Sequence, residues 1–79
     1  MPKTRTQFRV NARYRDGGSI RRYLATRVQA EQTARHQART NAPNVREVTV
    51  CERGPGKRWR LIYSCYFRTS DRQLVQDAR

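Results

Sequence analysis

The residues that could do chemistry in this 79-residue chain are its arginines. Eighteen basic residues face six acidic ones, for a net charge of +12, and sixteen of the eighteen are arginine. Arginine presents a planar fork of donors that suits phosphate and carboxylate, and it stacks on bases and aromatic rings. A codon bias would explain arginine over lysine, but not the shortage of acids. Because so much like charge repels itself and no fold needs it, the composition predicts a polyanionic partner.

The groups that catalysis needs form no pattern. His36 is the single histidine, and on a helix it would lie near Arg35 and Arg39, with no acid to orient it. The six acids are scattered, without the paired carboxylates of general acid–base chemistry. Cys51, Cys65 and His36 are too widely spaced for a zinc site. We therefore expect no enzymatic activity, no cofactor and no metal.

Two strands are expected ahead of a helix. Residues 7–15 alternate strictly between apolar and polar side chains, which is typical of a half-buried strand. Residues 16–19, Asp-Gly-Gly-Ser, indicate a hairpin turn, because glycine accepts the positive φ that tight hairpins need. Residues 19–25 then form the return strand.

The facing of the return strand is open to two interpretations. A two-residue loop would turn three residues toward the core, namely Arg21, Tyr23 and Ala25. A bulge would instead turn toward the core Ile20, Arg22 and Leu24. The two large aliphatic side chains of the second set favour the bulge.

A helix is expected from about Arg27 to about Thr40. Thr26 and Gln29 form a capping-box pattern at its start, and Pro43 disfavours helical geometry just beyond its end. Alanine recurs every four residues and makes a narrow face that lets the helix lie close to a sheet, at Ala30, Ala34 and Ala38.

Two further strands are expected over 45–53 and 58–68, joined by the Gly-Pro-Gly-Lys turn at 54–57. A tight turn would pair Val50 with Leu61 and Val48 with Tyr63, so that both apolar stripes face the same way. This register assigns Trp59 to the core. It also places Cys51 and Cys65 on opposite faces, which argues against a disulfide.

The predicted fold class is therefore α+β, with a β-β-α-β-β order and an antiparallel sheet packed on one helix. Residues 1–6 are expected to be a flexible basic arm, 7–68 a single domain, and 69–79 a tail with a short C-terminal helix capped by Ser70 and Gln73. The sequence has no apolar run of membrane-helix length and no signal-peptide core, so a cytoplasmic protein is expected, nucleoid-associated if it binds DNA.

If this register holds, one sheet face is left largely arginine, with Tyr66 among the basic residues. Arginines that hold phosphates, interleaved with a ring, fit a nucleic-acid surface. With one ring, contact with the backbone is better supported than base stacking. The candidate binding residues are Arg5, Arg9, Arg13, Arg15, Arg21, Arg22, Arg58, Arg60, Tyr66 and Arg68.

Residues 12–19, Ala-Arg-Tyr-Arg-Asp-Gly-Gly-Ser, are followed by Arg21, Arg22, Tyr23, Thr26, Ala30 and Glu31. This stretch resembles the hairpin and helix of the arm-type DNA-binding domains of phage tyrosine recombinases. The resemblance implies a sheet that enters the major groove, with DNA contacts from Arg13, Arg15, Arg21 and Arg22. That family places three strands before the helix, whereas two are expected here. The chain as a whole resembles small basic proteins of phages and actinobacteria.

Three functions remain open at this point. The first is a non-enzymatic nucleic-acid-binding protein, for DNA rather than RNA, such as an accessory factor of a phage or mobile element. The second is a protein-interaction module, such as a phage-encoded inhibitor that binds an acidic surface of a host protein, since charge complementarity steers either encounter. The third is a structural homo-oligomer, for example a homodimer, that pairs through a sheet edge or the long fourth strand.

Overall fold

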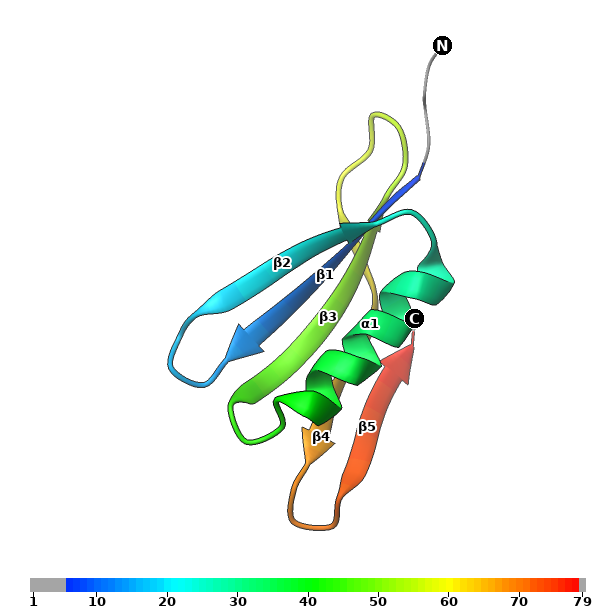
Figure 1. Ribbon diagram of the computed structural model, residues 1–79. Helices are drawn as coiled ribbons and strands as arrows, with labels where there is room; N and C mark the ends of the chain where they lie inside the picture. Colours follow the sequence, from blue (N-terminus) through cyan, green and yellow to red (C-terminus); the bar gives the residue numbers. More distant parts are fainter. Residues whose placement is uncertain (1–5, 79) are drawn as a thin grey trace.

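The computed structural model describes residues 6–78 and shows one sheet covered by one helix (Figure 1). In chain order the elements are β1 (Gln7–Tyr14), β2 (Ser19–Leu24), α1 (Arg27–Thr40), β3 (Val45–Arg53), β4 (Arg60–Arg68) and β5 (Gln73–Ala78). Neighbouring strands are antiparallel throughout, in the order β2-β1-β3-β4-β5. The predicted α+β class, with an antiparallel sheet packed on a helix, is confirmed. The expected basic arm lies outside the described residues, except for Thr6.

The prediction of a short C-terminal helix is wrong, because residues Gln73–Ala78 form β5. They pair with β4 from Arg68 opposite Gln73 to Tyr63 opposite Ala78. A helix of so few residues is marginal by itself, whereas a strand gains ladder hydrogen bonds along the edge that β4 would otherwise leave open. The turn into β5 passes through Arg72 with a left-handed φ of 57°.

β5 also changes which strands lie at the edges of the sheet. β4 is paired with β3 on one side and with β5 on the other. Self-association through β4 is therefore ruled out as an edge pairing, contrary to that part of the expectation. The edge strands of the described sheet are β2 and β5 (Figure 1).

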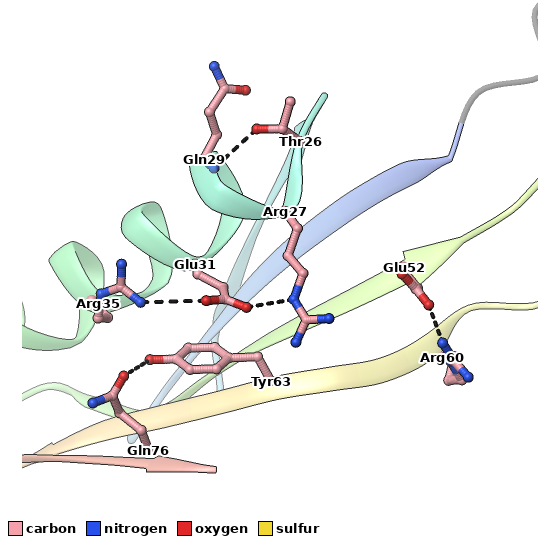
Figure 2. Close-up of polar contacts among 9 residues, drawn as sticks. All are labelled: Thr26, Arg27, Gln29, Glu31, Arg35, Glu52, Arg60, Tyr63 and Gln76. Carbon is pink, nitrogen blue, oxygen red and sulfur yellow. Dashed lines mark hydrogen bonds and ion pairs between the residues drawn. The ribbon is translucent and has the colours of Figure 1, made fainter. Parts of the chain in front are cut away.

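The core lies between α1 and the middle of the sheet. Three alanines of α1 are fully buried, which lets the helix backbone approach the strands closely: Ala30, Ala34 and Ala38. They pack against small and β-branched side chains of the central strands, chiefly Val10, Ala12, Val48 and Val50. The Thr26 hydroxyl caps α1 by accepting a hydrogen bond from the Gln29 amide at 3.2 Å (Figure 2). The predicted cap and small-residue face are both confirmed.

Polar side chains of α1, β4 and β5 form hydrogen bonds and ion pairs on the helix side of the sheet (Figure 2). Glu31 lies between Arg27, at 2.7 Å, and Arg35, at 3.7 Å. Beneath them the Tyr63 hydroxyl donates to Gln76 Oε1 on β5 at 2.6 Å. Burial raises the pKa of Tyr63 and of its neighbour Cys65 above their ordinary values. The central part of this side of the sheet therefore packs against α1.

The facing of β2 follows the second of the two interpretations. Residues 15–17 form a three-residue loop, with Gly17 at a φ of 98° and the Tyr14 amide donating to Gly18 O at 2.8 Å. Ile20 then pairs with Ala12, and Leu24 with Phe8. These two residues and Arg22 face the helix side of the sheet, while Arg21 and Tyr23 face away.

The register expected for β3 and β4 is wrong by two residues, since Val50 pairs with Tyr63 and Val48 with Cys65. An irregularity follows, because Cys51 pairs with Leu61 and leaves Ile62 as an extra residue in β4. Ile62 is buried in the core. The extra residue reverses the facing of the chain that precedes it, so Leu61 and Trp59 lie on the opposite side from the one predicted.

Candidate nucleic-acid interface on the open face of the sheet

We call the side of the sheet opposite α1 the open face. Side chains alternate between the two sides of each strand, and cross-strand partners lie on the same side. The open face therefore consists of the strand residues that alternate with those facing α1. Its arginines come from four strands and are Arg9, Arg13, Arg21, Arg53 and Arg68. Its aromatic side chains are Tyr23, Trp59 and Tyr66. Glu47 and Asp77 are the acids that the pairing assigns to it. Apart from the segment around Trp59, no described element covers this face.

Four of these residues meet at one end of the sheet, and we call them the Trp59 cluster: Arg9, Tyr23, Arg53 and Trp59. The guanidinium carbons of Arg9 and Arg53 lie 4.4 Å and 4.7 Å from the centroid of the Trp59 ring. The Tyr23 ring is 6.1 Å from it, centroid to centroid, at an interplanar angle of 47°. The cluster therefore joins β1, β2 and β3 to the segment that leads into β4.

The reason for this cluster is the path of the chain between β3 and β4. Gly56 has a φ of 68°, which lets the chain turn, and the Lys57 amide donates to Gly54 O at 3.0 Å. The extra residue in β4 then sends Trp59 to the open face. The expectation that Trp59 belongs to the core is therefore wrong: its ring is partly exposed and lies over arginines, not over the apolar residues beneath α1.

Two clefts share Trp59 as a lining residue. One, of about 650 Å³, is lined by Gln7, Tyr23, Arg53 and Trp59 together with Thr6, Leu24 and Ala25. The other, of about 480 Å³, is lined by Trp59 and basic residues of the β3–β4 connection, Lys57, Arg58 and Arg60, with Thr6, Glu52 and Gly54. Trp59 thus borders both an aromatic and polar cleft and a basic one.

The open-face arginines differ in how closely each is paired with an acidic side chain. Arg68 is held by Asp71 through two hydrogen bonds, of 2.9 Å and 2.7 Å, which raise the pKa of Arg68 and lower that of Asp71. Arg13 has only a long ion pair, 4.0 Å, with Glu47. Arg21 forms no ion pair with any described residue. Arg21, two residues from Tyr23 along β2, is therefore an open-face arginine left for a ligand.

The two guanidiniums of the Trp59 cluster, those of Arg53 and Arg9, form few hydrogen bonds. Arg53 donates to Gln7 Oε1 at 2.8 Å. The Nε of Arg9 is buried and has no hydrogen-bond partner. The Trp59 ring is the contact that the structure shows for the Arg9 guanidinium.

The structure brings together half of the predicted binding residues. Those on the open face are Arg9, Arg13, Arg21, Tyr66 and Arg68. Arg22 faces the helix side of β2, contrary to its grouping with Arg21. Arg60 also faces the helix side, because the extra residue in β4 reverses the facing expected for it, and it is bonded to Glu52 (Figure 2).

The remaining predicted residues lie in connections or outside the described residues. Arg15 is exposed in the β1–β2 loop, where its amide donates to Asn44 O at 2.8 Å. Arg58 precedes β4 and lines the basic cleft, although the sequence predicts it within the strand. Arg5 lies outside the described residues.

Three open-face residues were missed: Tyr23, Arg53 and Trp59. For Tyr23 the signal was present, because the facing favoured for β2 turns it away from the helix. For Arg53 the signal was also present, because alternation along 45–53 turns it away from the face of Val48 and Val50. For Trp59 no local signal was present, since the extra residue in β4 has no turn-forming glycine or proline of its own.

Other reactive groups of the described chain do not gather into a second site. Cys51 is on the open face and Cys65 is in the core, both as free thiols, so the prediction that they lie on opposite faces is confirmed. His36 Nε2 is 3.4 Å from the Thr40 hydroxyl on α1. Across residues 6–78, no group of three or more His, Cys, Asp or Glu is placed to hold a metal ion. None of the described helices has the length and apolarity that crossing a membrane requires.

The fold and this face define a small α+β domain with an arginine- and aromatic-rich sheet surface. Comparison with protein-family models, with curated proteins and with solved structures found no match to this chain. The resemblance to the arm-type domains of phage recombinases therefore stays a prediction. Of the four arginines that it implicates, Arg13 and Arg21 share the open face, whereas Arg15 and Arg22 do not.

Proposed function

We propose that this protein binds nucleic acid through the open face of its sheet. The observation that carries the proposal is the gathering of five arginines and three aromatic rings on the face that α1 leaves uncovered. Guanidinium groups bind phosphate oxygens with well-directed hydrogen bonds, and aromatic rings offer surfaces to bases. The net charge of +12 supplies long-range attraction to such a polyanion.

The distribution of charge supports a binding role over a solvated surface. Two of the six acids lie on the open face, against five arginines, so the face itself is strongly positive. The strands that carry Arg21 and Arg68, β2 and β4, are three strand spacings apart, about 14 Å. A face of this breadth is large enough to contact several phosphates of one strand.

The test uses two neighbouring arginines of β2 that face opposite ways. Arg21 and Arg22 are both exposed, and each loses one charge on substitution by alanine. Fluorescence anisotropy with labelled DNA and RNA, single-stranded and duplex, should show that Arg21→Ala weakens binding and lowers the log–log salt slope by about 1. Arg22→Ala should affect both much less, because it is matched in charge but lies on the helix side.

Two results would overturn the proposal. One is the absence of binding to every nucleic acid at low salt. The other is an equal loss for the two variants, which would mean that net charge alone, and not the open face, sets the affinity. Polyglutamate at matched charge serves as the competitor: if it displaces nucleic acid at equal concentration of charge, an acidic protein partner becomes the better explanation.

A further inference from the structure

We infer that the Trp59 cluster is a stacking site for an unpaired nucleobase, so that the protein prefers single-stranded nucleic acid to duplex. This rests on the proposed function and specifies its ligand. The sequence alone favours contact with the backbone, because it assigns Tyr66 as the single ring on the basic face. The structure places two more rings, Tyr23 and Trp59, on that face and brings them into contact.

The rings are arranged so that a further planar group can be added. Tyr23 is 61% exposed although it contacts Trp59. At 47° the two rings are tilted and not stacked face to face. Because the guanidiniums of Arg9 and Arg53 already lie over Trp59, the ring surface offered to a base is chiefly that of Tyr23. The cleft of about 650 Å³ that the two rings line has room for a base.

The surroundings of the rings supply the other parts of a nucleotide site. The Gln7 amide and the Arg53 guanidinium line the same cleft and can donate to or accept from the edge of a base. Lys57 and Arg58 line the basic cleft, which Trp59 also lines, and a phosphate of the same strand would be held there. A base in the first cleft and a phosphate in the second match the two kinds of lining.

The geometry favours unpaired bases for a simple reason. In a duplex the faces of each base are covered by the neighbouring base pairs, so only base edges and the backbone are offered to a protein. An aromatic ring that lines a cleft can contact a base face only when that base is unstacked. A duplex would contact the arginines of the open face and leave the rings of the Trp59 cluster without a stacking partner.

Trp59 is the single tryptophan of the chain, and so it reports on its own site. Intrinsic fluorescence would be recorded while the full-length protein is titrated at low salt with a short oligothymidylate, its RNA counterpart, a duplex of equal length, and an abasic oligonucleotide of equal length. Stacking predicts quenching by the two base-bearing single strands and little quenching by the abasic chain, which has the same phosphates but no bases. The DNA and RNA arms show which kind of strand supplies the base.

The matched variants lie on opposite sides of β2. Tyr23→Leu removes the exposed ring, and Ile20→Ala truncates an exposed side chain that is 50% accessible on the helix side. Measured with labelled oligonucleotides, Tyr23→Leu should weaken single-strand binding about five-fold or more, because one base–ring stack is worth about 1–3 kcal/mol. It should leave duplex binding nearly unchanged. Ile20→Ala should affect neither.

The outcomes separate this inference from the proposed function. If no nucleic acid binds, both fail. If abasic and base-bearing strands bind equally, or duplex binds more tightly than single strand, the inference fails while the proposed function stands. Quenching of Trp59 that is lost in Tyr23→Leu and absent with the abasic chain would support it.

Discussion

The guanidinium carbon of Arg9 lies 4.4 Å from the centroid of the Trp59 ring, although the two residues are fifty positions apart in the chain. The contact holds the segment before β4 against β1, across the intervening strand β3. Because the Arg9 Nε is buried with no hydrogen-bond partner, the ring is what offsets the loss of water around this cation. The same contact shapes the two clefts on which the proposed ligand site depends.

This contact should be measurable as a coupling energy. In a double-mutant cycle of Arg9→Met and Trp59→Leu, urea unfolding should give a favourable interaction of about 0.5–2 kcal/mol. Methionine keeps the apolar stem of arginine and removes the charge. A parallel cycle of Arg22→Met with Trp59→Leu should give none, since Arg22 lies on the other side of the sheet. A coupling of zero in the first cycle would contradict the cation–π assignment.

The alanine face of α1 should not accept larger side chains. Ala34 is fully buried, so Ala34→Leu would force the helix away from the sheet and cost about 1–3 kcal/mol or more in free energy of unfolding. Gln32→Leu adds a side chain at an exposed position of the same helix and should change stability by less than about 0.5 kcal/mol. Chemical denaturation would compare them, and equal stability of the two variants would be inconsistent with the observed packing.

Stability should decline at alkaline pH. Burial raises the pKa of Cys65 above 9.0 and that of Tyr63 above 10.0. In the unfolded chain both groups lose their protons at their ordinary values, so above those values the unfolded state binds fewer protons than the native state, and stability falls as pH rises. Thermal melting from about pH 8 to pH 11 should show this decline. Cys65→Ala should flatten it, whereas Cys51→Ser should not. A melting temperature that is constant or rises over this range would argue against burial of these groups.

The two thiols should react at different rates. Cys65 is 2% exposed, whereas Cys51 is partly accessible on the open face. Alkylation of the native protein followed by mass spectrometry should modify Cys51 first, and Cys51→Ser should leave one slowly reacting thiol. In denaturant both should react quickly. Faster labelling of Cys65 in the native state would mean that α1 does not cover it.

The turn that leads into β5 should be improved by glycine. Arg72 has a φ of 57°, a conformation that costs a non-glycine residue about 1 kcal/mol. Arg72→Gly should therefore raise the free energy of unfolding relative to Arg72→Ala, which removes the same charge but keeps the strained backbone. The two variants would be compared by urea unfolding. A variant with glycine that is less stable than the one with alanine would contradict the left-handed turn.

The sequence by itself determined the elements whose signals are local. Strict alternation in β1, the Gly17 turn, the Thr26 cap and the repeated alanines of α1 each depend on residues that lie close together in the chain. The excess of arginine over acids is equally plain in the composition, and it indicates an anionic partner without reference to the fold. The order of the first five elements, β-β-α-β-β, follows from local signals of this kind.

The tertiary structure decided which side chains share the open face. One extra residue at Ile62 moved Trp59 from the expected core to the basic face, because side chains in a strand alternate and a shift of one residue reverses their facing. Pairing along β4 likewise converted the expected final helix into β5, since an open strand edge offers hydrogen bonds that a short helix cannot match. Both outcomes depend on register between strands distant in the chain, and no local pattern encodes that register. The arginines were therefore visible in the sequence, whereas their assembly around Trp59 was not.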